Sequence, residues 1–589
     1  MYLIATTFII HSKKKFIMTA KLHSDSFKQF STEAANFAQQ IENLKSTPAD
    51  VAKVVEFIND NQDWMSFISQ HPSANRESVE NLSRRLHQIG TTEGEKVAKM
   101  IDQYLTSDVS LSKDAMKEVL RHTGKHLRDP EMRKTLANAS QTSKGMRQAC
   151  TEVTIELIND NHLRLSDIGF EDADEAIKFL INSPAKDRIK YVNFDELPLN
   201  NEQFEKLTKN CPHLQHIEIP KSLLSGDSLK HIANLTKLQS LSIGWCDQLE
   251  SDALRHLANL TNLQSLTIRW CEHLERDALK HLVNLTNLQS LDIGYCTQLE
   301  IDALKHLANL TSLQSLTIEG CRQLERDSLK HLVNLKDLQS LTIRWCTQLE
   351  RDSLKYVANL KNLQSLDIGW CTGLKRDSLK CVANLKNLQS LDIGWCTGLE
   401  RDAFKHLAKL TTLQSLNIGY CIQLESDALK HLASLTNLQS LTIEGCTQLE
   451  GNTLKHLANL TKLQSLNITG CTQLERDALK HLANLTTLQS LNIGYCTQLE
   501  SDALKHLSNL TNLQSLSIGR CDQLESDALK HLVNLTNLQS LNIRECTQLK
   551  LNIMEFTHNG GFFIFSNIYG DLITGKKLET LLNKFRNEL

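Results

Sequence analysis

The sequence predicts an α/β fold: a curved solenoid of parallel strands and short helices, preceded by an all-α helical domain. Three observations lead to this prediction. A 25-residue unit recurs from about residue 189 to residue 550. Each unit has one half with strand periodicity and one half with helix periodicity. All seven prolines lie between Pro48 and Pro220, so the composition changes where the repeats begin.

The regular unit, LQSLSIGWCDQLESDALRHLANLTN, first appears at Leu238. Its first part fits the pattern L-x-x-L-x-L-x-x-C of a leucine-rich repeat. Less regular copies begin with IKYVNF at Ile189 and LQHIEI at Leu214, which gives about fifteen copies in all. The nearly identical copies begin at Leu238, Leu263, Leu288, Leu313, Leu338, Leu363, Leu388, Leu413, Leu438, Leu463, Leu488, Leu513 and Leu538.

The two halves of the unit predict different secondary structure. Leu238, Leu241 and Ile243 alternate with outward residues and indicate a short strand, whereas Leu254 and Leu257 mark one face of a short helix. One unit cannot bury a core by itself, so each depends on its neighbours. We expect an aspartate before each helix to cap its free amides. These residues are Asp252, Asp277, Asp302, Asp327, Asp352, Asp377, Asp402, Asp427, Asp477, Asp502 and Asp527, with Asn452 in one copy.

The regions outside the repeats have their own patterns. Residues 18–182 predict a helical domain, because apolar residues recur at three- and four-residue spacing in segments such as ADVAKVVEFI and GEKVAKMIDQYL. Residues 1–17 are expected to be a non-structural extension before Met18. Residues 551–589 are expected to cap the last unit: LNIMEF keeps part of the helix pattern, and GKKLETLLNKFRNEL predicts an amphipathic closing helix.

Charge and hydropathy exclude several classes of partner. The 589 residues include 65 Lys plus Arg and 68 Asp plus Glu, for a formal charge of −3. This balance provides no polybasic field, so we expect neither a nucleic-acid nor a membrane partner. The apolar stretch from Tyr2 to Ile10 is about half the ~20 residues that a membrane-spanning helix requires. The basic residues Lys13 to Lys15 follow that stretch instead of preceding it, which argues against a secretory signal.

Thirteen of the sixteen cysteines, from Cys246 to Cys546, occupy one position of the repeat. We expect them to turn inward and form a structural ladder in which thiols meet loop carbonyls. Neighbouring coils would bring these thiols close enough to cross-link in an oxidising environment, so a reducing, cytoplasmic location is expected. No C-x-x-C pair is present, and neither a metal nor a cofactor is predicted.

A histidine occupies one position of the helical half in most copies. We interpret these histidines as solvated residues of the convex face, with a pH-sensitive ladder as the alternative. Tyr356 and Cys381 replace histidine in two copies, so the repeat does not require an imidazole at this position. The histidines are His231, His256, His281, His306, His331, His406, His431, His456, His481, His506 and His531.

An aromatic residue precedes the repeat cysteine in most copies and is predicted to lie at the rim of the concave face. Such residues bury well in a protein partner, but the rings could equally stack on one another and stabilise the sheet edge. Gly320, Gly445 and Gly470 interrupt the series, and Arg520 and Glu545 end it. The candidate protein-binding aromatics are Trp245, Trp270, Tyr295, Trp345, Trp370, Trp395, Tyr420 and Tyr495.

The outward strand positions vary most between copies. The residue corresponding to Ser242 is Ser, Thr, Asp or Asn, and two residues later glycine gives way in some copies to other residues. Variation on one face of a copied unit fits a binding surface, and drift at unconstrained solvent positions explains it equally well. Arg269 and Arg344 at these positions join the candidate protein-binding residues.

The unit with cysteine at the end of its consensus resembles the cysteine-containing leucine-rich repeats of F-box ubiquitin-ligase substrate receptors. The segment NCPHLQHIEI from Asn210 is especially similar. The resemblance spans residues 189 to 546 and implies a repeat array that binds a substrate protein. The helical region contains no L-P type F-box motif. Similar arrays also occur in bacterial proteins delivered into host cells.

The function that follows from the sequence is a non-enzymatic scaffold that binds a protein partner on the concave face and aromatic rim. The alternative is a substrate-recognition adaptor of a ubiquitin ligase, of which a host-directed bacterial effector is one form. An enzyme in the helical domain has little support, because its histidines form no constellation with nucleophiles or carboxylates. Neither the partner nor its pathway follows from the sequence.

Overall fold

The computed structural model describes residues 170–549 except positions 184, 196, 247, 276 and 300. It also describes short pieces between residues 154 and 166 and the segments 553–556, 562–565 and 572–588. The chain forms two compact units, Met1–Leu197 and Pro198–Leu589. The extension predicted for residues 1–17 and most of the helical domain predicted for residues 18–182 lie outside the described residues.

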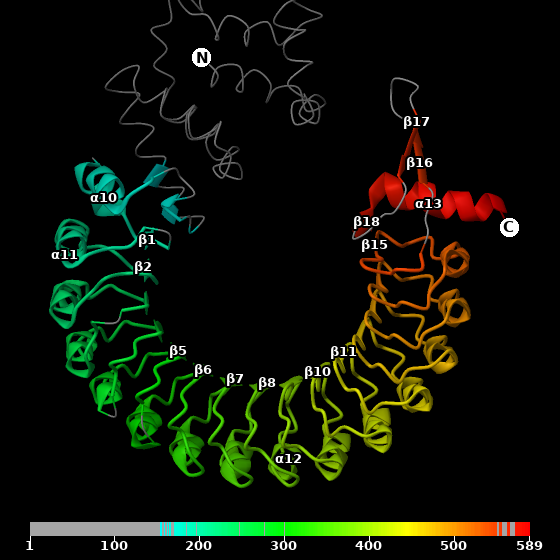
Figure 1. The fold of residues 1–589 in the computed structure, drawn as a ribbon. Coiled ribbons are helices and arrows are strands. Elements are labelled where there is room, and N and C mark those ends of the chain that lie inside the picture. Colours follow the sequence, from blue (N-terminus) through cyan, green and yellow to red (C-terminus); the bar gives the residue numbers. More distant parts are fainter. Residues whose placement is uncertain are drawn as a thin grey trace, which may run out of the picture. The chain divides into compact units, whose positions relative to one another are not determined.

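In the first unit, helix α10 (Ala173–Asn182) ends the region predicted to be helical (Figure 1). Asp172 caps it by accepting a hydrogen bond from the backbone N–H of Glu175 at 2.7 Å. Its buried face includes Ile177 and Leu180, spaced three residues apart. The 3₁₀ turn η4 (Lys186–Arg188) and strand β1 (Tyr191–Asn193) follow.

The second unit begins with helix α11 (Asn201–Asn210), where Asn200 and Gln203 form a reciprocal capping box. Its sheet then runs in chain order from β2 to β15, with each strand parallel to the next and in register. In Figure 1 the strands line the inner side of a curved stack and the helical turns lie outside. The strands are β2 (His216–Ile219), β3 (Ser240–Gly244), β4 (Ser265–Arg269), β5 (Ser290–Asp292), β6 (Ser315–Thr317), β7 (Ser340–Thr342), β8 (Ser365–Asp367), β9 (Ser390–Asp392), β10 (Ser415–Asn417), β11 (Ser440–Thr442), β12 (Ser465–Asn467), β13 (Ser490–Asn492), β14 (Ser515–Ser517) and β15 (Ser540–Asn542). This arrangement confirms the predicted solenoid.

The outer half of almost every coil is a 3₁₀ helix rather than the short α-helix that leucine spacing suggests. A 3₁₀ helix rises ~2.0 Å per residue, so a few residues cover more of the coil than an α-helix would. The turns are η5 (Gly226–Asn234), η6 (Ser251–Leu257), η7 (Ala278–Leu282), η8 (Ile301–Asn309), η9 (Ser328–Asn334), η10 (Ser353–Lys355), η11 (Val357–Asn359), α12 (Leu379–Val382, α-helical), η12 (Arg401–Lys409), η13 (Ser426–Ser434), η14 (Gly451–Leu457), η15 (Ala478–Leu482), η16 (Ser501–Leu507) and η17 (Ser526–Leu532).

The predicted aspartate caps are wrong. In η6, η9 and η12, as in the other described repeat turns whose start is defined, no side chain caps the first amides. Most of the aspartates instead pair with an arginine of the preceding coil or with a basic residue three positions along, and Asp327 pairs with Lys355 of the following coil. Arg326 to Asp352, Arg351 to Asp377 and Arg401 to Asp427 are examples of the pairs between coils. Sequence spacing does not show this partner, because it lies about one coil away.

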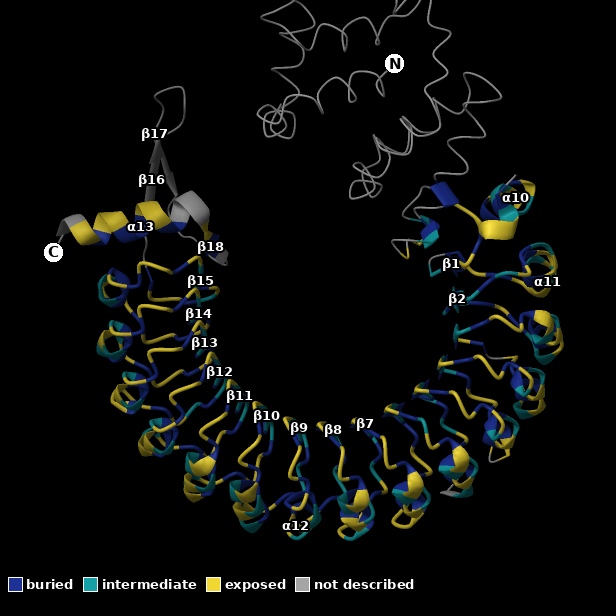
Figure 2. Ribbon diagram, turned by 180° about the vertical axis from the view of Figure 1, so that it is seen from behind, coloured by how far each residue is buried: buried dark blue, intermediate teal, exposed yellow. Residues whose placement is uncertain are grey.

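The core is a column of aliphatic side chains between the sheet and the helical turns. In the first regular coil, Leu238, Leu241, Ile243, Leu254 and Leu257 are all fully buried. Figure 2 shows buried residues along the interior of every coil and exposed residues on the outer turns. Because each coil covers the leucines of the next, burial is shared between neighbours, as expected for a repeat array.

The last coils are covered by the C-terminal segment. Strand β18 (Leu572–Thr574) pairs antiparallel with β15, and helix α13 (Gly575–Glu588) follows it. Arg586 donates two hydrogen bonds to the carbonyl of Val533, and Leu578, Leu581 and Phe585 are buried. The predicted closing helix is therefore present. The segment LNIMEF keeps only part of the helix pattern, and within it strand β16 (Ile553–Phe556) forms and pairs with β17 (Phe562–Phe565).

Candidate interaction surface

All eight candidate aromatics adopt a left-handed backbone conformation. Their φ angles lie between 55° and 62°, and Gly320, Gly445 and Gly470 have φ near 70° at the same place in their coils. A bulky residue with positive φ is unfavourable by about 1–3 kcal/mol. The backbone is held there by a hydrogen bond to the next coil, as when Trp345 donates its N–H to the carbonyl of Gly369 at 3.1 Å. The repeated turn therefore imposes the conformation on whichever residue precedes the cysteine.

The rings form two stacks between coils. In the first stack, Trp245 lies 4.7 Å from Trp270, which lies 3.9 Å from Tyr295. The second contains Trp345, Trp370, Trp395 and Tyr420, whose neighbouring ring centroids are 3.8–4.1 Å apart. Each contact is nearly parallel, with interplanar angles of 14° or less. Stacking thus offsets part of the backbone strain.

A tyrosine ends each stack over a glycine. The Tyr295 hydroxyl donates to Glu319 at 2.9 Å, and the Tyr420 hydroxyl donates to Glu444 at 3.0 Å. A Cβ on Gly320 would lie only 2.6 Å from the Tyr295 ring. The equivalent distance from Gly445 to the Tyr420 ring is 2.5 Å. Gly320 and Gly445 are therefore part of the stacks, whereas Gly470 has only the Gly445 backbone nearby.

Tyr495 stands apart from both stacks, and its ring faces the guanidinium of Arg520 at 4.8 Å. Arg520 in turn pairs with Glu545 of the next coil. Trp245 and Tyr495 expose 53% and 46% of their surface, whereas the stacked rings between them are less exposed. Mutual stacking, one of the two interpretations of the rim, is what the rings do here. It uses their faces and leaves mainly ring edges for a partner.

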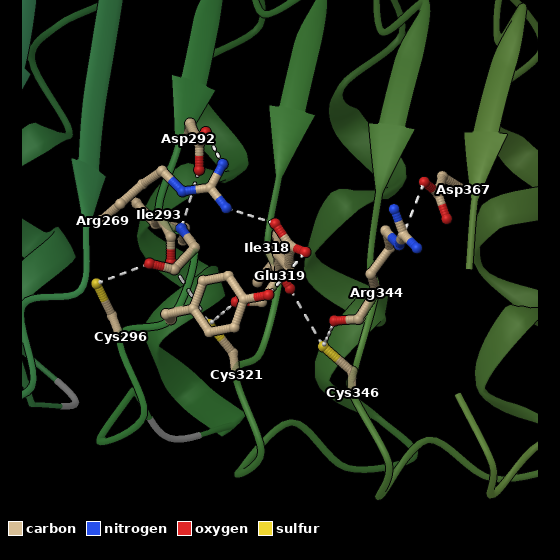
Figure 3. Close-up of polar contacts among 12 residues, drawn as sticks. Arg269, Asp292, Ile293, Cys296, Ile318, Glu319, Cys321, Arg344, Cys346 and Asp367 are labelled. Carbon is tan, nitrogen blue, oxygen red and sulfur yellow. Dashed lines mark hydrogen bonds and ion pairs between the residues drawn. The ribbon is translucent and has the colours of Figure 1, made fainter. Parts of the chain in front are cut away.

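The concave face carries a charged cluster at its first half. Arg269 donates to Asp292 at 3.0 Å and also pairs with Glu319, two coils further along (Figure 3). Glu319 additionally accepts the Tyr295 hydroxyl. Burial raises the pKa of Asp292, while the Gly294 N–H and the Arg269 charge oppose that rise. One guanidinium thus serves two carboxylates here.

In the middle of the concave face, two aspartates lie close together with a weaker contact to an arginine. Asp367 and Asp392 lie directly opposite each other in adjacent parallel strands. Arg344, seen beside Asp367 in Figure 3, approaches that carboxylate only to 3.7 Å. Asp392 accepts a hydrogen bond from the neutral amide of Asn417 at 2.9 Å. Burial, reinforced by the Asp392 charge, raises the pKa of Asp367 to about 6.

A polar groove of about 820 Å³ crosses the coils from residue 314 to residue 462. Its asparagines are fixed by donating to the preceding coil, for example from Asn362 to the Lys336 carbonyl at 3.0 Å. Its only charged lining residues are Asp337 and Lys462. The lining residues are Gln314, Asp337, Gln339, Asn362, Gln364, Asn387, Gln389, Thr412, Gln414, Asn437, Gln439 and Lys462. The groove was not predicted, although the glutamine after the first leucine of every regular unit signals a repeated exposed amide.

The predicted cysteine ladder is confirmed. The repeat thiols are buried, and each from Cys296 to Cys546 donates to the isoleucine carbonyl of the preceding coil at 2.9–3.5 Å. Burial raises the pKa of Cys321, Cys371 and Cys421 to about 12. These thiols stay protonated near neutral pH, so they are structural donors and not nucleophiles.

The prediction of solvated histidines is wrong. The His281 side chain is only 18% exposed, and its Nε2 lies 3.5 Å from Asp252 of the preceding coil. The buried Nε2 atoms of His306, His331 and His406 have no hydrogen-bond partner, and His481 and His506 repeat this pattern. Burial, followed by the adjacent lysine charge, lowers the pKa of His306 and His331. The histidines are therefore favoured in the neutral form.

No three His, Cys, Asp or Glu side chains among the described residues are arranged to hold a metal ion. In the same residues, no helix has the length and apolarity needed to span a bilayer.

Residues 295–563 match the family described as a leucine-rich repeat region. Together with the parallel sheet and the thiol ladder, this match shows that the array is a leucine-rich-repeat solenoid of the cysteine-containing kind. The match begins within the array, whereas the same coil structure is present from β3 onward.

Three solved structures illustrate what the chain is similar to. An internalin, inlF, from Listeria monocytogenes is 22% identical over 64% of this chain and 92% of its own, with a TM-score of 0.37. The yeast Rad7 and Elc1 complex gives 21% identity, 60% and 90% coverage and a TM-score of 0.39. The TLR13–ssRNA13 complex gives 20% identity, 64% and 53% coverage and a TM-score of 0.41. No curated protein matches the chain.

Proposed function

We propose that the array is a non-enzymatic scaffold that binds a protein partner on its concave face. One observation carries the proposal: the core residues are copied from coil to coil, whereas the outward strand residues differ. At the position of Thr342, for example, the next coils have Asp367, Asp392, Asn417 and Thr442. At ~4.8 Å per strand, this surface is long enough for a protein and far longer than a small ligand needs.

The aromatic rim has a narrower role in this proposal than the sequence suggests. Because the ring faces are used in the two stacks, a partner meets ring edges and the exposed rings of Trp245 and Tyr495. Aromatic residues at such edges contribute apolar contact without a change in the fold. The ubiquitin-ligase adaptor stays a prediction, since the segment expected to dock a scaffold lies outside the described residues.

The test compares proteins captured by the immobilised full chain and by two lysine variants. The concave variant carries Thr267→Lys, Thr317→Lys and Thr442→Lys, at outward strand positions. The control carries Asn309→Lys, Asn459→Lys and Asn509→Lys, at exposed positions on the helical side, with the same change of charge. Partners retained by the control and lost from the concave variant support the proposal. Equal retention by both variants contradicts it.

A further inference from the structure

Two independent features share the coils at the middle of the array. The amide groove passes over Gln364 and Gln389, which begin the turn into strands β8 and β9. Asp367 and Asp392 lie three residues further along the same strands. In each coil the intervening leucine is buried, so Ser365 and Ser390 are the only outward residues between groove and carboxylate. Nothing larger than a serine side chain separates the two features along the strand.

The carboxylates in the middle have a weaker contact to a cation than those of the first half. Like charges directly opposite each other on adjacent strands are destabilising. Arg269 contacts both Asp292 and Glu319 directly, whereas Arg344 pairs with Asp367 only at 3.7 Å. Within the described part of the chain, Asp392 accepts hydrogen bonds only from neutral groups, the Asn417 amide and the Gly394 N–H. An external cation at this place would relieve the repulsion between Asp367 and Asp392.

No side chain lies directly beside the carboxylates, because the buried Gly369 is there. A Cβ on Gly369 would lie 3.3 Å from Asp367 Oδ1 and 3.4 Å from Asp392 Oδ1. The carbonyl oxygen of Gly394 lies 3.3 Å from the same point. Oxygen atoms from two strands therefore surround a place that holds no side chain. Gly394 and Gly419 continue this glycine strip in the next two coils.

We propose that these coils bind an extended basic polypeptide segment of the partner, with its backbone along the amide groove and a Lys or Arg side chain between Asp367 and Asp392. The glutamine side chains offer both donors and acceptors to a peptide backbone, independent of its sequence. The carboxylates add selectivity for a cationic side chain, and charge-assisted hydrogen bonds are the stronger kind. This assignment rests on the proposed function and specifies the chemistry of the partner.

The test measures fluorescence anisotropy of a labelled ten-residue peptide of alternating Arg and Ser, added to the full chain at near-physiological salt. A Glu and Ser peptide of equal length is the probe control. The double variant Asp367→Asn and Asp392→Asn is expected to bind the basic peptide at least tenfold more weakly. Asparagine fits this position, because Asn417 and Asn492 already occupy it and accept the same backbone N–H at 2.9 and 3.1 Å. A thermal melt checks that the variant stays folded.

The matched control is Asp402→Asn with Asp427→Asn, which makes the same charge change where the aspartates pair with Arg376 and Arg401 on the helical side. Its affinity for the basic peptide is expected to stay within twofold of the wild type. A second pair, Gln364→Ala with Gln389→Ala, is expected to weaken binding about threefold or more. All three results together support the proposal.

Three outcomes would overturn it. Equal weakening in the concave and control double variants would show that only bulk charge attracts the peptide. Equal binding of the Glu and Ser peptide would remove the selectivity for cations. Absence of any binding to the basic peptide, while captured partners still depend on the concave lysine variant, would overturn this inference and leave the proposed function standing.

Discussion

The first half and the middle of the concave face have the same strand register, but a guanidinium contacts its carboxylates closely only in the first half. Arg269 contacts Asp292 and Glu319 in the first half, whereas Asp367 faces Asp392 in the middle with Arg344 at 3.7 Å. Strand spacing and register are the same in both places. Duplication of a coil thus fixes the backbone of the scaffold. A few outward substitutions decide how closely an arginine contacts the carboxylates on the concave face.

Removal of Arg269 is expected to give the largest difference in stability between the two regions. Arg269→Ala leaves two partly buried carboxylates without their cation and should lower stability by about 2 kcal/mol. The figure is below that for a fully buried pair, because the Arg269 side chain is 33% exposed and water screens the charges. Urea unfolding at pH 7.5 measures the change. Arg344→Ala is the matched variant and should lower stability by less than half as much; an equal loss would abolish the distinction.

Glycine variants at the ends of the two aromatic stacks test whether the first half and the middle of the array differ in anything besides charge. Gly320→Ala and Gly445→Ala should each destabilise by about 2 kcal/mol, because the new methyl group meets a tyrosine ring at positive φ. Gly470→Ala has similar φ but its nearest neighbour is 3.6 Å away, so about 1 kcal/mol is expected. Thermal or urea unfolding compares the three variants. Unequal losses for Gly320 and Gly445 would mean that the two stacks are not equivalent.

Asp367→Asn should stabilise the protein by about 1 kcal/mol at pH 7.5. The folded-state pKa of Asp367 is raised to about 6 from 3.8, so above pH 6 the fold holds a carboxylate that is more favourable in the unfolded chain. As the pH falls from 6 toward 4, that penalty disappears and the advantage of the variant should vanish. Urea midpoints at pH 7.5 and 4.5 measure it. A variant less stable than the wild type at pH 7.5 would contradict the expectation that the Asp367 carboxylate destabilises the fold.

Acidification should have a smaller, region-dependent effect. The pKa of the repeat histidines from His256 to His531 is lowered by burial, so the unfolded chain binds protons first and stability falls as the pH drops below about 6.5. Tyr356 and Cys381 replace histidine in the coils next to Asp367 and Asp392. Hydrogen exchange at pH 7.5 and 5.5, corrected for intrinsic rates, should show greater loss of protection near His306 and His331 than near Tyr356 and Cys381. Uniform loss across the array would contradict this expectation.

The sequence by itself determined the repeat, the parallel register and the buried column. The spacing of Leu238, Leu241 and Ile243 indicates strand alternation. Because the pattern is nearly identical in every coil, each strand can pair with the next in the same register. The inward thiol also follows from the pattern, because a small donor beside a turn finds a loop carbonyl. These properties are local or repeat identically from coil to coil, so one coil predicts them all.

Only the tertiary structure decided the contacts between side chains of different coils. Asp252 and its equivalents have the right spacing to cap a helix, yet arginines about one coil away provide the stronger attraction for several of them. The sequence left open whether the aromatic rings bind a partner or stack on one another, and in the folded array their faces are stacked. The pairing of Asp367 with Asp392, and the oxygen atoms that surround Gly369, likewise arise from residues brought together only when neighbouring coils stack. Charge and shape at such places depend on the neighbouring coil, which spacing within one coil does not report.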